Sequence, residues 1–214
     1  MGMTLQEAMA ARHSVRSYES KAVPEDLRAQ LQQEVERINR EAGLDFQLIW
    51  DEPSVFAGKV AGAQNCVALV GPKGADEKVG YYSAQVLLKI QQLGLNSVWV
   101  AMSFNKKEAA KRCKLGSDES MLGAVAFGYG TTQGKPRKSK PMEALCKVDC
   151  PMPEWFRAGM EAAMLAPTAM NQQRFVFALE GDEVTAKAKL GPLTKVDLGI
   201  AKCFFELGSG HKVA

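Results

Sequence analysis

The stretch Leu165-Ala-Pro-Thr-Ala-Met-Asn-Gln-Gln-Arg-Phe-Val-Phe177 joins a predicted helix to a predicted strand. The helix, expected over 153–165, should end before Pro167, because proline disfavours a helical conformation in the residue before it. The strand should begin near Arg174, where apolar residues follow. The connection between them is polar and contains Thr168, Asn171, Gln172 and Gln173. Amide side chains carry donors and acceptors, so they can match the edge of a pyrimidine or flavin ring. The alternative is a turn in which Asn and Thr satisfy nearby backbone groups.

Outward from this stretch, helical and strand patterns alternate along the whole chain. Helices are expected over 4–12 and 105–115, each opened by a capping-box pattern, Thr4 with Glu7 and Asn105 with Glu108. A helix is also expected over 24–43, where Leu31, Val35 and Ile38 recur at helical spacing before Gly43. Further helices are expected over 81–93, 153–165 and 198–207. Strands are expected over 45–50, 66–70, 97–102, 121–129 and 174–179. This alternation predicts an α+β protein of the three-layer α/β type, with a mixed central sheet flanked by helices.

Composition excludes several classes of protein. The chain has 214 residues, of which 46% are hydrophobic and 24% charged, so it can bury a core and is not intrinsically disordered. No apolar run approaches the ~20 residues that span a bilayer, and no signal-peptide pattern opens the chain. The five cysteines are scattered and only two histidines are present, which argues against a disulfide framework or a zinc site. We expect a cytoplasmic protein without a membrane or metal partner.

The segment Arg12-His-Ser-Val-Arg-Ser-Tyr18 is the first candidate binding segment. If it is extended, Arg12, Ser14 and Arg16 point to the same side. Two guanidinium groups and a hydroxyl would then suit a phosphate or an electron-rich ring edge. A solvated basic linker is the alternative.

A second basic segment, Lys135-Pro-Arg-Lys-Ser-Lys140, places four cations within six positions. These cations repel one another unless they face water or an anion. Nucleic acid is one such anion, but no aromatic residue interleaves the lysines and the net charge is only +3. We therefore expect no nucleic-acid partner, although the basic segments keep that alternative open.

Five short motifs together resemble the FMN-dependent nitroreductase family. They are Arg12–Tyr18, Gly94–Trp99, Gly128–Tyr129, Lys138–Glu143 and Ala166–Phe175. In most of that family the motif matched by Ala166–Phe175 follows the first arginine motif within a few dozen residues, whereas here it lies near the C-terminus. This order resembles a shuffled subgroup with two fused half-domains. We therefore expect a single nitroreductase-like domain over 1–214 that can contain two pseudo-equivalent halves, about 1–150 and 151–214.

The resemblance implies an FMN site. For the FMN phosphate it implies Arg12, Lys138 and Lys140, with Arg137 as a substitute, while Arg16 would reach the phosphate or the pyrimidine edge. His13 and Ser14 would bond the phosphate, the ribityl chain or the ring edge. Backbone amides around Met102 and Ser103 would approach flavin N5. The Ala-Pro-Thr motif supplies the residues expected at the isoalloxazine edge, which are Pro167, Thr168, Asn171 and Gln173.

The implied activity is hydride transfer from NADH or NADPH through flavin N5 to a nitroaromatic, a quinone or another electron-poor small molecule. No catalytic side chain is expected, because the cofactor carries this chemistry. The resemblance also implies a homodimer. A non-catalytic module that binds a flavin or nucleotide is the alternative function, and a nucleic-acid-binding protein is a more distant one.

Overall fold

The computed structural model describes every residue except Met1, Ala57 and Lys59. Contacts divide the chain into two compact units that interleave along the sequence. Unit 1 comprises Met1–Met3, Ala11–Ala75 and Val86–Pro136, and unit 2 comprises Thr4–Ala10, Asp76–Gln85 and Arg137–Ala214. The predicted halves, about 1–150 and 151–214, stay a prediction, and the two units divide the chain at other residues.

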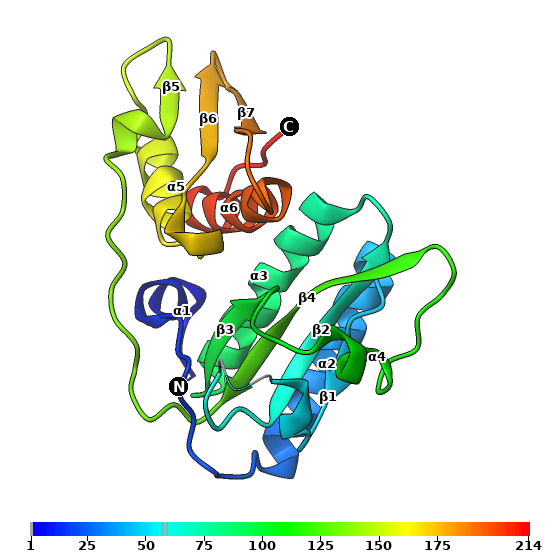
Figure 1. The fold of residues 1–214 in the computed structure, drawn as a ribbon. Helices are drawn as coiled ribbons and strands as arrows, with labels where there is room; N and C mark the ends of the chain where they lie inside the picture. Colours follow the sequence, from blue (N-terminus) through cyan, green and yellow to red (C-terminus); the bar gives the residue numbers. More distant parts are fainter. Residues whose placement is uncertain (1, 57, 59) are drawn as a thin grey trace. The chain divides into compact units, whose positions relative to one another are not determined.

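Unit 1 contains a four-stranded antiparallel sheet (Figure 1). Its strands in spatial order are β1 (Gln47–Ile49), β2 (Asn65–Pro72), β4 (Glu119–Gly128) and β3 (Asn96–Val100). The two central strands, β2 and β4, are mostly buried, as expected for short apolar runs bounded by turn residues. β3 forms one edge of the sheet, so a further segment of chain can pair with it.

Both faces of this sheet are covered. Residues on one face of β2, among them Cys66 and Ala68, belong to a core cluster with Val55 and Phe104. On the other face, Phe127 meets Trp50 edge-on with ring centroids 5.2 Å apart. Arg28 of α2 (Glu25–Ala42) lies 4.7 Å from the centroid of the Trp50 ring, so α2 belongs to this second face. The short helices η1 (Pro53–Val55) and α4 (Lys106–Ala110) contact each other.

Unit 2 contains a mixed three-stranded sheet and two helices that pack together. β5 (Cys146–Val148) runs parallel to β6 (Phe175–Glu180), which pairs antiparallel with β7 (Glu183–Ala188). α6 (Thr194–Ser209) packs on α5 (Glu154–Met164) and also contacts β6 and β7 (Figure 1). The rings of Phe205 on α6 and Phe177 on β6 stack with centroids 4.8 Å apart. α6 is therefore the central helix of this unit.

Two helices contribute residues to both units, α1 (Leu5–Ala11) and α3 (Asp76–Gln92). The predicted capping box begins α1: the Glu7 N–H donates to Thr4 Oγ1 at 3.2 Å, and the Thr4 N–H donates to Glu7 Oε2 at 2.8 Å. Within unit 2, the first turns of α3 pack closely on α6. A side chain at Gly199 would collide with the backbone carbonyl of Glu77, and Lys202 pairs with the Glu77 carboxylate at 2.9 Å.

The predicted α+β class is confirmed. Among the described residues the strands form two sheets, and the mixed sheet is the one in unit 2. β5 and β7 were not predicted, because β5 has only three residues and β7 buries only Val184. α3 and α6 begin earlier than expected, at Asp76 and Thr194, and α4 ends at Ala110 rather than Leu115.

Candidate functional site

The segment from Arg12 to Tyr18 lies along the β3 edge of the sheet in unit 1. Ser14 forms a parallel bridge with Ser97, where the Val15 N–H donates to the Ser97 carbonyl at 3.0 Å. The buried hydroxyl of Tyr18 donates to the Val15 carbonyl at 2.8 Å. The backbone of this segment is therefore fixed by the sheet.

Side chains in this segment do not follow the strict alternation expected of an extended strand. Val15 and Tyr18, three positions apart, are both buried in the core cluster. Arg12 is only 1% exposed, whereas Arg16 is exposed and His13 and Ser14 are half-buried. The segment forms isolated bridges rather than a continuous strand. The expectation that Arg12, Ser14 and Arg16 point to the same side stays a prediction.

The turn before the second basic segment packs on the first candidate segment. Gly134 has φ +77°, and a Cβ there would lie 2.7 Å from His13 Cβ and 3.3 Å from the Ser14 carbonyl oxygen. Asn96 supports the same turn, because its Oδ1 accepts the Gly130 N–H at 3.0 Å. Glycine at 134 therefore allows the chain to pass close to His13.

Met102 and Ser103 lie in unit 1, in the connection between β3 and α4. The Met102 side chain is 82% exposed and Ser103 is half-buried. The connection ends at Asn105, whose Oδ1 caps α4 by accepting the N–H groups of Lys107 and Glu108 at 3.2 and 3.3 Å. This confirms the predicted cap.

In unit 2 the structure joins the basic segment 137–140 to the polar connection that follows α5. Asn171 Nδ2 donates to the Lys138 carbonyl at 2.8 Å. The Lys140 amine donates to the carbonyls of Gln172 at 2.6 Å and Gln173 at 3.2 Å. Arg137 donates to the Leu165 carbonyl. Two segments that the sequence presents as separate candidates are thus one surface, which carries Lys138 as an exposed side chain.

These hydrogen bonds occupy some of the donors that the family resemblance assigns to a ligand. Burial lowers the pKa of Arg137 to about 10, so its guanidinium is still charged at neutral pH. Lys140 has one N–H left, because an ammonium group has three donors. The Asn171 amide donates to backbone in this structure.

Residues 168–173, which we name the amide loop, have an unusual backbone. Met170 and Asn171 have φ +52° and Gln173 has φ +43°. Such values in residues other than glycine cost about 1–2 kcal/mol each and persist only where neighbouring groups hold them. Thr168 is one such group, because its Oγ1 accepts the Gln173 N–H at 3.1 Å. Pro167 and Thr168 are half-buried at the start of the loop.

Gln173 is 1% exposed and has a buried donor that is not used within the described part of the chain. Its Oε1 accepts the Lys140 N–H at 2.8 Å, which fixes the orientation of the amide. Its Nε2 has no hydrogen-bond partner there. A buried donor without an acceptor costs about 1–3 kcal/mol, so this group suits an acceptor on a ligand.

Asp197 was not predicted. It lies in the first turn of α6, is 3% exposed, and accepts the Ala169 N–H and Gln172 Nε2, both at 2.8 Å. Burial raises the pKa of this carboxyl, and the two hydrogen bonds oppose that rise. A lone acid within the apolar run Val196–Phe205 is the signal in the sequence that would have found it.

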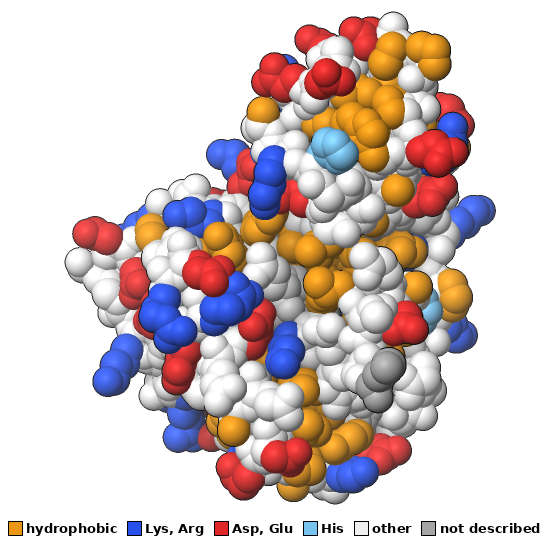
Figure 2. All heavy atoms as spheres, turned by 180° about the vertical axis from the view of Figure 1, so that it is seen from behind, with side chains coloured by type: hydrophobic (Ala, Val, Ile, Leu, Met, Phe, Trp, Pro, Cys, Tyr) orange, Lys and Arg blue, Asp and Glu red, His pale blue; other side chains and the backbone are white. Residues whose placement is uncertain are grey.

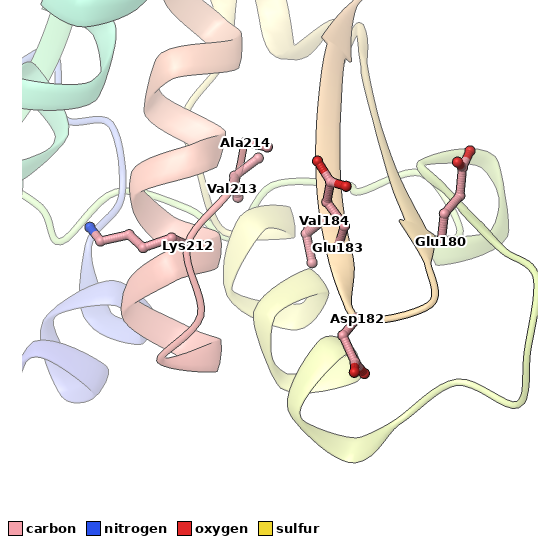
Figure 3. Close-up of a pocket in the computed structure, with 7 residues that line it drawn as sticks. All are labelled: Glu180, Asp182, Glu183, Val184, Lys212, Val213 and Ala214. Atoms are coloured by element: carbon pink, nitrogen blue, oxygen red, sulfur yellow. The ribbon is translucent and has the colours of Figure 1, made fainter.

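One hollow of unit 2 contains none of the predicted residues. It measures about 560 Å³ and is lined by the β6–β7 hairpin and the tail after α6, with Glu180, Asp182, Glu183 and Lys212 among its residues (Figure 3). The three carboxylates point in different directions (Figure 3). No group of three or more metal-ligating His, Cys, Asp or Glu side chains occurs among the described residues.

The face drawn in Figure 2 carries lysines and arginines interspersed with acidic side chains. Mixed charge of this kind is typical of an ordinary solvated surface. None of the helices in the described part of the chain combines the length and the apolar character needed to cross a membrane.

Comparison with known proteins gives the same fold. Residues 4–209 match a protein-family model described as "Putative TM nitroreductase". A solved structure described as a putative nitroreductase from Thermotoga maritima MSB8 is 20% identical, covers 97% of this chain and 84% of its own, and has a TM-score of 0.66. No curated protein matches.

Two further solved structures share the fold at lower coverage. One, described as a putative nitroreductase in complex with FMN from Desulfovibrio desulfuricans, is 19% identical over 70% of this chain and 98% of its own, with a TM-score of 0.54. The other, described as a putative NADH oxidase from Clostridium acetobutylicum, is 16% identical over 64% and 96%, with a TM-score of 0.51. With the fold confirmed and the family model spanning nearly the whole sequence, the chain belongs to the family described as Putative TM nitroreductase.

Proposed function

We propose that this protein is an FMN-dependent oxidoreductase of the shuffled-order nitroreductase subgroup. The observation that carries the proposal is the surface on unit 2 where the basic segment 137–140 is hydrogen-bonded to the amide loop, with a buried, unused amide donor on Gln173. Family membership and a solved relative that holds FMN support the same conclusion.

The residues present fit a flavin ring edge. Gln173 Nε2 is a neutral donor, and the pyrimidine part of a flavin offers carbonyl and ring-nitrogen acceptors. Asn171 lies on the same loop and can exchange its bond to the Lys138 carbonyl for one to the ring. Lys138 is exposed beside these amides and would favour negative charge on a bound ring or phosphate.

A second set of proposed FMN-binding groups lies on unit 1. We assign Arg12 and Arg16 to negative charge on FMN, His13 and Ser14 to polar groups of the cofactor, and the backbone at Met102 and Ser103 to the region of flavin N5. The fixed backbone of the 12–18 segment supports this assignment, because groups on an already ordered backbone bind a ligand with a smaller ordering cost.

When bound, FMN supplies the redox centre that accepts hydride from NADH or NADPH and passes electrons to an electron-poor acceptor such as a nitroaromatic or a quinone. The protein's part is to bind, orient and exclude water, and the chain needs no nucleophile of its own for that. We also propose that the protein works as a homodimer.

The visible spectrum of the purified protein tests the cofactor. We expect yellow protein, or colourless protein that takes up one FMN on titration and quenches its fluorescence, and bleaching on addition of NADH or NADPH without oxygen. Bound FMN that neither nicotinamide reduces would instead indicate a binding module. A chain that neither contains FMN nor binds it would overturn the proposal.

A substitution that keeps the charge tests the assignment of Arg12. Arg12→Lys keeps the charge but loses the bidentate guanidinium, so we expect FMN to bind about tenfold more weakly, on the order of one charge-assisted hydrogen bond. Lys114→Ala removes an exposed lysine in unit 1 outside both proposed sets and is the control. Equal dissociation constants for the two variants would remove Arg12 from this role.

A further inference from the structure

The amide loop of unit 2 needs an external support. Three of its residues have left-handed backbone conformations, and such a backbone relaxes unless surrounding groups hold it. The basic segment holds the loop at Lys138 and Lys140, through the Asn171 side chain and the carbonyls of Gln172 and Gln173. That leaves the opposite end of the loop, at Ala169, to be held by another element.

Asp197 of α6 supplies that second support. Its Oδ1 accepts the backbone N–H of Ala169 and its Oδ2 accepts Gln172 Nε2, both at 2.8 Å. Gln172 Nε2 also donates to the Pro192 carbonyl at 2.8 Å, which ties the loop to the start of α6. One buried carboxylate therefore bridges two points of the loop that lie three residues apart.

Burying the Asp197 carboxylate costs hydration energy, which indicates that its hydrogen bonds to the loop have a role. Asp197 is 3% exposed, and in the described part of the chain it forms no ion pair with a lysine or an arginine. A buried carboxylate without a cation loses much of its hydration energy. An apolar residue at this position on the central helix would avoid that desolvation cost, so the bonds to the loop are what the carboxylate provides.

The loop that Asp197 holds is also the loop that carries the unused donor. Lys140 fixes the Gln173 amide from one side through Oε1, while Asp197 fixes the backbone on the other side. A donor held in this way loses little conformational entropy when it binds an acceptor.

We infer that Asp197 is a positioning residue, which holds the amide loop in the conformation that presents the Gln173 amide to a planar heteroaromatic ring with carbonyl acceptors. That the ring is a flavin rests on the proposed function. Asp197 is not assigned any contact with the ligand.

Asp197→Asn in the full chain tests this inference. The variant keeps the size of the side chain but turns one acceptor into a donor, which then faces the N–H of Ala169 or the side-chain amide NH2 of Gln172. Two measurements apply: amide hydrogen exchange of the peptide 166–175 without FMN, and the FMN dissociation constant from fluorescence quenching. We expect at least tenfold faster exchange at Ala169 and about tenfold weaker FMN binding, on the order of one hydrogen bond to a charged group.

Glu206→Gln is the matched control. Glu206 is a half-buried carboxylate of α6 that accepts the hydroxyl of Tyr81 and the amine of Lys212, at 2.7 and 2.6 Å, and does not touch the amide loop. It should change neither exchange in 166–175 nor FMN affinity. If Asp197→Asn does not fold, Gln172→Ala removes one of the two bonds to Asp197, together with the bond to the Pro192 carbonyl, and should change exchange and FMN affinity in the same direction.

The outcomes separate the two proposals. Faster exchange together with weaker FMN binding supports the positioning role. A folded Asp197→Asn chain with unchanged exchange, or with faster exchange and unchanged FMN affinity, overturns it. If the wild-type chain binds no FMN, the proposed function fails, and the exchange measurement still decides whether Asp197 holds the loop.

Discussion

At the scale of single residues, glycine 134 shows how closely the chain approaches His13. Its positive φ would strain any side chain, and its Cβ would in addition lie 2.7 Å from His13 Cβ. Gly74 has a similar φ of +86°, but a Cβ there would meet nothing within 4 Å. Comparing substitutions at the two positions therefore distinguishes the effect of backbone strain from that of a steric collision.

We predict that Gly134→Ala lowers the free energy of unfolding by more than Gly74→Ala. Both changes should cost about 1–2 kcal/mol for the left-handed backbone, and the collision at 134 should add about 1–3 kcal/mol. Urea unfolding of the two variants measures this difference. Equal losses would show that His13 moves aside freely, and the close approach would then be of no consequence.

Local side-chain chemistry was the most predictable part of the structure. The caps at Thr4 and Asn105 were found from the sequence, because they depend on neighbours two or three positions away. The bond from Asn171 to the Lys138 carbonyl was not, because its partners are 33 residues apart. Sequence patterns identified both segments as candidates but contained no information on whether they meet.

At the scale of elements, the pairing of the amide loop with α6 makes stability depend on pH. The pKa of Asp197 is raised by burial, with hydrogen bonds from Ala169 and Gln172 opposing the rise. A carboxyl whose folded pKa lies above its unfolded value stabilises the fold below the unfolded pKa, and this contribution is lost as the pH rises through the folded pKa. The ionised form of Asp197 therefore supports the loop at a cost in stability.

We predict that Asp197→Asn gains stability relative to the wild type as the pH rises from 4 to 7, because the neutral amide does not incur this loss. Urea unfolding of the FMN-free proteins across that range measures the trend. Gln172→Ala removes one of the hydrogen bonds that oppose the rise in the Asp197 pKa. Its free energy of unfolding should therefore fall more steeply with rising pH than that of the wild type. If the free energy of unfolding of the wild type instead rises relative to that of Asp197→Asn as the pH rises, the hydrogen bonds to Asp197 have a larger effect on its pKa than burial has.

Element prediction succeeded where periodicity was strong and failed where tertiary contacts decide. α2 ends at Ala42 with Gly43 as its cap at φ +60°, close to the end that its pattern of Leu31, Val35 and Ile38 predicted. β7 was missed although its polar and apolar residues alternate, because it buries only Val184 and is built largely of Glu, Lys and Ala, which are depleted in strands. α3 begins at Asp76 because its first turns are held by α6, and a sequence window cannot detect that contact.

At the scale of the whole molecule, the interleaving of the two units limits where the chain can be divided. Unit 2 is built from residues on both sides of position 150: β5 pairs with β6, and the 76–85 part of α3 packs on α6. A fragment of residues 151–214 would lack both partners. Domains of this size bury too little surface to tolerate such losses.

We predict that residues 1–150 and 151–214, expressed separately, do not both fold cooperatively, and that 151–214 alone does not fold. Circular dichroism melting curves and amide dispersion in NMR spectra measure this. Mixing or co-expressing the fragments should restore the cooperative transition, because contacts rather than chain continuity hold unit 2. A cooperative melt for isolated 151–214 would instead favour the predicted halves as independent bodies.

The order of the segments along the chain also affects how the protein is made. All residues of unit 1 have been synthesised once Pro136 has been added, whereas unit 2 begins with residues 4–10 and must wait for α6. Domains fold during translation as their segments leave the ribosome. Unit 1 can therefore assemble on the nascent chain, while the apolar surfaces of the first turns of α3 stay uncovered until the last helix emerges, and chaperones have access to them during that interval.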